Sequence, residues 1–139
     1  MPQKTSLKHL AEEVFRADRF ATETTAITID EVELHRCRCS LVLTDRHRNA
    51  LGAVMGGVLF TMADFGAAIA ANTECMSDGN LRWISLDSTI NYLAGAKGQK
   101  LESETVCIKH GRTTALYRTT INDGDRTVAE VTSTMVCAG

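Results

Sequence analysis

Apolar and polar residues alternate with the two-residue period of a β-strand in two blocks of this chain, and a long apolar segment separates the blocks. The first block predicts strands over residues 24–30 and 32–43, with a turn at 31–33 between them. The second block predicts four strands, over residues 83–93, 99–110, 112–122 and 126–137. The alternation is clearest at Cys37, Cys39, Leu41 and Leu43, which we expect on one buried face.

Helical periodicity appears in two places. Near the N-terminus, Thr5 or Ser6 can cap a helix that runs to about residue 17. A second helix is predicted to begin at Gly56-Gly57 and to end near residues 75–76, about 20 residues or about 30 Å long. This helix is apolar on all sides, so a curved sheet and a second subunit must cover it. The order of helix, two strands, helix and four strands predicts an α+β fold.

Length, charge and cysteine content narrow the class of protein. A chain of 139 residues is one domain by size. The net charge of −2, without a dense basic block, gives no reason to expect a nucleic-acid partner. The chain has five cysteines, an odd number, and no Cys-x-x-Cys pair. The N-terminus lacks the apolar core of a secretory signal. Together these features predict a reducing, cytoplasmic location.

Residues 50–71 form an apolar run long enough to raise the possibility of a membrane span. The run contains four glycines and is weakly hydrophobic for its length. Its one charged residue, Asp64, would cost about 2.5–3.5 kcal/mol near a bilayer centre. We therefore expect a core helix and no membrane partner.

Asp64 is the clearest candidate for chemistry. A carboxylate placed in an apolar helix is costly unless it is paired, hydrogen-bonded or neutralised, so a sequence that keeps one there is usually using it. Burial is expected to raise the pKa of such a group, and N–H or hydroxyl donors are expected to lower it. The alternative is a structural aspartate that bonds a backbone group of a second subunit.

The spacing of residues around this helix resembles a known family. Asn49, Gly52, Gly56, Gly57 and Asp64 fall where hotdog-fold acyl-CoA thioesterases of the phenylacetate-degradation (4-hydroxybenzoyl-CoA thioesterase-like) type carry their motif, and residues 84–93 resemble the strand that follows. The resemblance implies a curved antiparallel sheet of five to six strands around one central helix. It divides the chain into a helical extension, residues 1–22, and a single hotdog thioesterase domain, residues 23–139.

The resemblance implies roles for four residues. Thioester hydrolysis needs a donor for the carbonyl oxygen and an attacking water or carboxylate. A free amide at Gly57, at the helix N-terminus, would polarise the carbonyl together with Asn49. Asp64 would come from the partner subunit as general base or nucleophile, and Ser85 would help to hold the water. The protein would act on acyl-CoA as a homodimer or as a dimer of dimers.

Further residues are expected to contact substrate. Met55 stands at the position where the family usually has histidine, next to Gly56. Thr61 lies one turn from both Gly57 and Asp64, although a bond to its own helix carbonyl is the simpler expectation. Lys97 and Arg112 are candidates for the coenzyme A phosphates. Weaker candidates for the same role are Arg46, His47, Arg48, Lys100 and Lys109.

Two alternatives stay open. Because methionine donates no hydrogen bond, Met55 favours a non-catalytic acyl-CoA-binding hotdog module as the main alternative. A hotdog dehydratase or hydratase is less favoured, because no histidine lies between His47 and His110 to serve as its catalytic histidine. His9, His35 and His110 show no metal-ligand spacing, so the sequence predicts neither a metal nor a cofactor.

Overall fold

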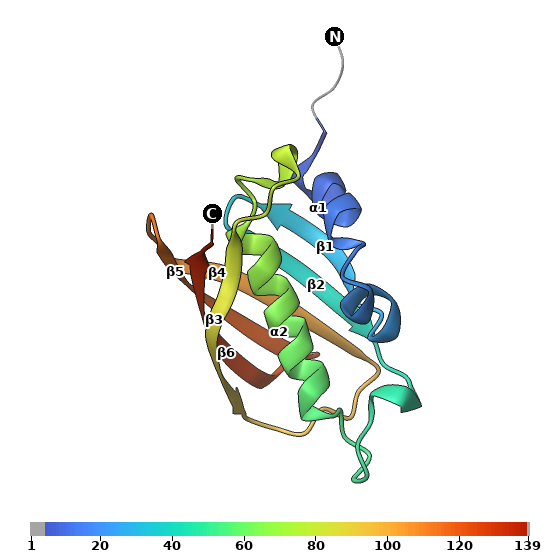
Figure 1. The fold of residues 1–139 in the computed structure, drawn as a ribbon. Helices are drawn as coiled ribbons and strands as arrows, with labels where there is room; N and C mark the ends of the chain where they lie inside the picture. Colours follow the sequence, from blue (N-terminus) through green and yellow to red (C-terminus); the bar gives the residue numbers. More distant parts are fainter. Residues whose placement is uncertain (1–4, 139) are drawn as a thin grey trace.

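The computed structural model describes residues 5–138. Six strands form one antiparallel sheet in the order β1-β2-β4-β5-β6-β3, and the helix α2 (Gly56–Ala71) lies across one face of it (Figure 1). This is the hotdog arrangement, and it confirms the predicted α+β class and the six strands. The strands are β1 (Thr28–Glu33), β2 (Arg36–Val42), β3 (Trp83–Tyr92), β4 (Lys100–His110), β5 (Thr114–Asp123) and β6 (Arg126–Cys137).

The face of the sheet that meets α2 carries the alternating apolar residues. Cys37, Cys39 and Leu41 of β2 are each 1% exposed, as their alternation predicted. Tyr117 and Met135 continue this buried face on β5 and β6. Fully burying a side chain of this size stabilises the fold by about 1.5–3 kcal/mol, so this face and α2 together form the core.

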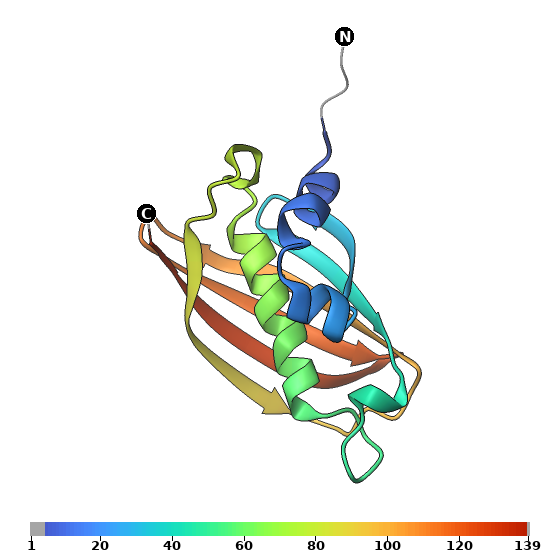
Figure 2. The ribbon, with the colours of Figure 1, turned by 45° about the vertical axis from the view of Figure 1, so that its right-hand side comes forward.

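The N-terminal segment packs against this core. Ser6 caps α1 (Leu7–Phe15) by accepting a hydrogen bond from His9 N at 3.1 Å, so the predicted helix is confirmed but ends earlier. A five-residue π-helix, η1 (Phe20–Thr24), follows, and Figure 2 shows both elements beside α2. The phenyl ring of Phe15 meets Phe65 of α2 edge-on at 5.9 Å, which joins the segment to the core.

The prediction of a strand over residues 24–30 places the start of that strand too early. Ala26 has a positive φ of 69°, which breaks an extended chain. Thr25 N donates to Phe20 O and Ile27 N donates to Ala21 O, so this backbone folds back onto η1. The strand β1 therefore starts only at Thr28.

The first hairpin turns at Leu34-His35, and the turn predicted at residues 31–33 is wrong. Glu33 pairs with Arg36 across a two-residue connection. His35 has a positive φ of 57°, and its backbone N donates to the hydroxyl of Thr73 at 2.9 Å. A contact across 38 residues thus holds a histidine in a conformation that few non-glycine residues adopt.

The helix α2 has 16 residues and ends before the predicted residues 75–76. Asn72 causes this early end. Its Oδ1 accepts from Arg82 N at 3.0 Å and from Trp83 N at 2.9 Å, while its Nδ2 donates to Ala68 O at 2.8 Å. One amide thereby satisfies a late helix carbonyl and the start of β3, and the chain continues into the 3-10 helix η3 (Met76–Asp78).

Within residues 5–138, no helix is long and apolar enough to cross a membrane. Cys37, Cys39, Cys75 and Cys107 are free thiols.

Gly66 sets how closely α2 approaches the sheet. A Cβ atom at this position would overlap Oγ1 of Thr105 on β4, which is held by Oγ1 of Thr119 at 2.8 Å. At Gly57, in contrast, an added Cβ would meet nothing within 4 Å. The sheet therefore needs the missing side chain at Gly66 but not at Gly57.

We predict that Gly66→Ala lowers the free energy of unfolding by about 1–3 kcal/mol, because an overpacked helix must move away from β4. Urea unfolding followed by circular dichroism measures the change. Gly57→Ala is the matched control and should cost nothing in stability. Equal stability of Gly66→Ala and the parent protein would contradict this account of the packing.

Candidate functional site

The N-terminus of α2 presents unpaired backbone N–H groups. Met55 is the N-cap residue, and its side chain accepts no capping hydrogen bond. The amide of Gly57, in the first turn, has no acceptor within its own helix. Gly56 packs against Tyr92, since an added Cβ would lie 2.9 Å from the Tyr92 hydroxyl, whereas Gly57 faces open space. Of the two glycines, only Gly57 has open space on its Cβ side, and it is the exposed one.

Asn49 organises the loop before α2. Its Oδ1 accepts from Leu51 N at 2.9 Å and from Ala53 N at 3.2 Å. These bonds commit the amide oxygen to the loop, and the Nδ2 group makes no hydrogen bond to any described residue. Asn49 and Gly56 line the same cleft of about 520 Å³, with Leu59 and Tyr92, so the loop and the helix N-terminus share one opening.

Asp64 and Ser85 meet, although 21 residues separate them in sequence. The Ser85 hydroxyl on β3 donates to Asp64 Oδ1 at 2.9 Å. The pairing of β3 with β6 shifts register between Ser85 and Asp87, which marks a bulge. Bulges re-aim side chains and are common beside active sites. The bond occupies one carboxylate oxygen of Asp64 and leaves the other for a ligand or water.

Asp64 is exposed in the single chain, which corrects the expectation that this carboxylate is buried. Gly57, Phe60 and Asp64 are the exposed residues of α2 and recur at the spacing of one helix face. The sheet covers the opposite face, where Met62, Phe65 and Ile69 are buried. The helix is thus apolar all round but is covered on only one side by its own chain.

A second carboxylate, that of Asp18, lines a cleft together with Asp64 and was not predicted from the sequence. Asp18 lines a cleft of about 300 Å³ with Phe20 of η1 and with Thr61 and Asp64 of α2. Two effects raise the pKa of Asp18: partial burial is the larger, and the negative charge of Asp64 is the smaller. No motif predicts Asp18 or Phe20, because the π-helix that begins at Phe20, two residues after Asp18, has no sequence signature of its own.

The remaining predicted residues are not all brought together. The Thr61 hydroxyl donates to Gly57 O at 2.8 Å, which is the helix bond that the sequence favoured. Met55 is 57% exposed beside the opening. Lys97 lies near the Asn49 loop, since the neighbouring Ala96 accepts from Val54 N at 3.0 Å. Arg112 lines a different cleft, with Glu74 near the C-terminal end of α2.

His47 is a structural residue, so it does not serve as an exposed cation for a phosphate. It is 6% exposed, with Nε2 at 2.7 Å from Thr25 O and Nδ1 at 3.0 Å from Thr44 N. Nε2 must carry a proton to donate to the carbonyl, and Nδ1 must lack one to accept from the amide. These two bonds define a neutral imidazole that ties the loop before α2 to the end of η1.

With this geometry in place, comparison with known proteins identifies the class. Residues 51–130 match the thioesterase superfamily, and the chain belongs to this family. A curated protein of Archaeoglobus fulgidus, named "Putative esterase", is 32% identical over 81 residues, which are 58% of this chain. The match spans 49% of that relative, so the chain covers about half the length of the curated protein it resembles.

Two solved structures share the fold. The PaaI protein of the E. coli phenylacetic acid degradation operon is 23% identical with a TM-score of 0.81, over 96% of this chain and 97% of that one. A hypothetical thioesterase protein with coenzyme A from Streptococcus pneumoniae is 25% identical with a TM-score of 0.77, over 90% and 97% of the two chains.

The raised pKa of Asp18 predicts a specific pH dependence of stability. The ordinary pKa of an aspartate is 3.8, so as pH rises above that value Asp18 loses its proton in the unfolded chain before it does so in the folded one. The folded state therefore loses stability as pH rises, until the raised pKa of Asp18 in the folded protein is passed. We expect Asp18→Asn to unfold at higher urea than the parent at neutral pH and to lose this advantage below pH 3.8. The exposed Asp125→Asn is the control. An equal effect of both variants at neutral pH would contradict the prediction.

Proposed function

We propose that this protein is an acyl-CoA thioesterase that hydrolyses a thioester to a carboxylic acid and free coenzyme A. The observation that carries the proposal is the open face of α2, where the exposed Gly57 of the first turn and the Asp64 carboxylate, held by Ser85, lie on one helix. Membership of the thioesterase superfamily supports the reaction, and coenzyme A in the pneumococcal structure supports the substrate class.

The proposed chemistry begins with the carbonyl. The Gly57 N–H, aided by the positive end of the α2 dipole, and the Asn49 Nδ2 group would bind the thioester oxygen and stabilise the negative charge that develops on it. Asp64 would then take a proton from water as general base or attack the carbonyl carbon itself as nucleophile. Collapse of the tetrahedral intermediate would break the C–S bond and release coenzyme A as its thiolate. On the nucleophilic route, water would then hydrolyse the acyl–Asp64 anhydride, which releases the acid and restores the carboxylate. Ser85 would keep Asp64 oriented.

The site is proposed to form between two subunits. Asp64 lies seven residues beyond Gly57, about 10 Å along the same helix, too far to act on a carbonyl at that amide. The uncovered face of α2 and the edge strand β3, where Leu86 is 66% exposed and Ile84 is 54% exposed, would pair with the same surfaces of a second copy. A homodimer would bring the partner's carboxylate to each amide, and two such dimers would form the tetramer.

Substrate contacts follow from this arrangement. Met55 and Gly56 would border the acyl thioester at the mouth of the Asn49 cleft, and Thr61 would line the cleft beside Asp64. Lys97 and Arg112 would contact the coenzyme A phosphates. Because these two residues lie at opposite ends of α2 in one chain, they would serve one coenzyme A only if they come from different subunits.

The first test is hydrolysis of a panel of acyl- and aryl-CoA esters, followed by release of free thiol. We expect Asp64→Asn to lower kcat by at least about 10²-fold, because an amide can neither accept the proton nor attack. Asp87→Asn, on the same strand as Ser85, should keep parent activity. Tight acyl-CoA binding without turnover in the parent protein would contradict the proposal and favour the non-catalytic module; a gain of turnover in Met55→His would support that reading.

Mixing two inactive variants tests the shared site. Gly57→Pro removes the proposed N–H at a first-turn position where proline is tolerated, and Asp64→Ala removes the carboxylate. Each homodimer should be inactive, whereas random refolding of an equal mixture should restore about a quarter of parent activity, because half of the dimers would contain one intact site. A site within one subunit predicts no recovery, and that result would overturn the proposed dimer.

A further inference from the structure

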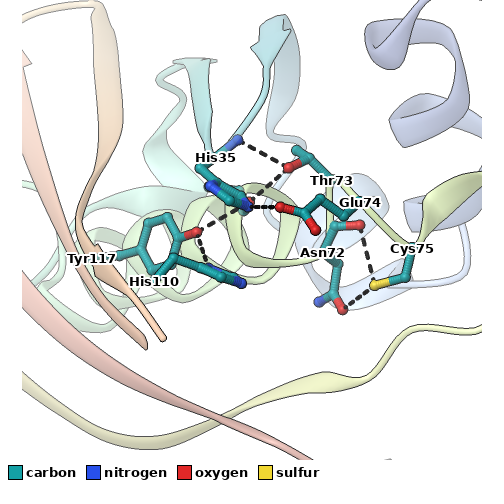
Figure 3. A network of polar contacts seen from close by, with 8 residues as sticks. His35, Asn72, Thr73, Glu74, Cys75, His110 and Tyr117 are labelled. Carbon is teal, nitrogen blue, oxygen red and sulfur yellow. Dashed lines mark hydrogen bonds and ion pairs between the residues drawn. The ribbon is translucent and has the colours of Figure 1, made fainter. Parts of the chain in front are cut away.

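Three residues with metal-ligating side chains meet at the end of the molecule remote from Gly57. His35 comes from the β1–β2 turn, Glu74 follows α2, and His110 ends β4 (Figure 3). One ligand atom from each side chain lies within 4.8 Å of the other two. Two imidazoles and a carboxylate form a donor set typical of Zn²⁺ sites that keep a fourth position open. The cluster is invisible in sequence, because 39 and 36 residues separate its members.

The Nε2 atom of His35 is buried without a hydrogen-bond partner. Glu74 Oε1 is 2.7 Å away, yet Nε2 forms no hydrogen bond with any described residue, so the carboxylate does not lie where a ring N–H would point. Buried polar atoms are nearly always satisfied, and an exception needs an explanation such as an ion. This atom therefore points to a ligand other than Glu74.

His110 is already oriented as a metal ligand would be. Its Nδ1 lies 2.8 Å from the hydroxyl of Tyr117, and that hydroxyl donates to Ala70 O at 3.5 Å. In the tautomer in which Nδ1 carries the proton and donates to the Tyr117 oxygen, Nε2 holds the lone pair that a metal ion would bind. A histidine ligand usually donates its second ring N–H to such a partner, which fixes its tautomer and orientation.

The position of His35 is also fixed by backbone contacts. The turn holds it at a φ of 57°, and its backbone N is bound by Thr73, the residue next to Glu74. On the other side, Glu74 and His110 line a surface cleft of about 290 Å³ through which a hydrated ion could enter. Two arginines, Arg82 and Arg112, line the same cleft, and Arg82 is paired with Asp78 at 3.3 Å, which reduces its repulsion of a cation.

We propose that His35, Glu74 and His110 bind a divalent transition-metal ion of the Zn²⁺ type. The ion would join three elements far apart in sequence, the first hairpin, the end of α2 and the end of β4, so its binding would stabilise the fold. The site lies beyond the C-terminus of α2, and none of its three ligands belongs to the proposed thioesterase site, although Arg112 lines the same cleft.

Binding requires a small rearrangement. The two imidazole rings are stacked, with centroids 4.0 Å apart and planes 12° from parallel. Stacked rings cannot both direct a lone pair at one ion, and two ligands of a tetrahedral Zn²⁺ lie only about 3.4 Å apart. One ring must therefore turn about its χ2 angle, while the side chain of Glu74, which is 62% exposed, can follow without repacking the core.

The test is a titration of the full chain, stripped with a chelator and dialysed, with ZnCl₂ by calorimetry. We expect one ion per chain and a rise in Tm on binding. We expect three variants to weaken binding more than about tenfold each: His35→Asn, Glu74→Gln and His110→Asn. Asparagine tolerates the positive φ at position 35, and at position 110 it can still reach Tyr117. His9→Gln is the matched control, because His9 and Glu13 form an exposed pair at 3.0 Å that should not contribute.

Co²⁺ provides a second readout that does not depend on stability. The parent protein should show the visible absorption of a tetrahedral Co²⁺ site without thiolate-to-metal charge transfer. A charge-transfer band would show that a cysteine such as Cys75, which lines the same cleft, holds the ion, and it would overturn the proposal. Absence of saturable Zn²⁺ binding, or unchanged affinity in all three folded ligand variants, would overturn it as well.

Discussion

The structure depends on one close approach, that of the small-residue face of α2 to the sheet. Gly66 leaves no space for a side chain against Thr105, and Ala63, Ala67 and Ala70 extend the same close packing along the helix. Such packing brings the helix near enough for the Ser85 hydroxyl to reach Asp64, since both sit where α2 crosses β3. A wider separation would cost core contacts and would also break this bond, so the geometry of the site is a consequence of the packing.

That packing has a second consequence, because a sheet can cover only one side of a helix. The opposite side of α2 is left with Gly57, Phe60 and Asp64 exposed on an otherwise apolar helix. In one chain the carboxylate is solvated, which weakens its electrostatic interactions. Cover from a second subunit would remove water from the same surface that carries the carboxylate. Assembly and the proposed hydrolysis would then rest on one surface of the protein.

The sequence predicted most of the architecture, because strand alternation and an all-apolar helix are periodic signals. The resemblance also indicated Ser85 as a residue that would help to hold the water, but the bond from Ser85 to Asp64 was not predicted. The sequence could not predict where a helix or strand ends when that end is set by a contact with a residue far away in sequence. Asn72 ends α2 through bonds to Arg82 and Trp83, and Thr73 fixes the hairpin turn at His35. Asp18 and the cluster at Glu74 arise only from tertiary folding, since residues far apart in sequence form them.

The two ends of α2 differ in whether a side chain satisfies the free backbone groups of the helix. At the C-terminal end, Asn72 satisfies a helix carbonyl and the chain beyond it is tied to β3. At the N-terminal end, Met55 provides no cap, although serine, threonine, aspartate or asparagine at an N-cap would stabilise a helix by about 1 kcal/mol. A capping side chain would bond to the N–H groups of the first turn, including those that a carbonyl substrate would need. Local rules are broken mainly where function requires it, so the uncapped end, rather than the apolar helix as a whole, is where the sequence would give up stability for the proposed site.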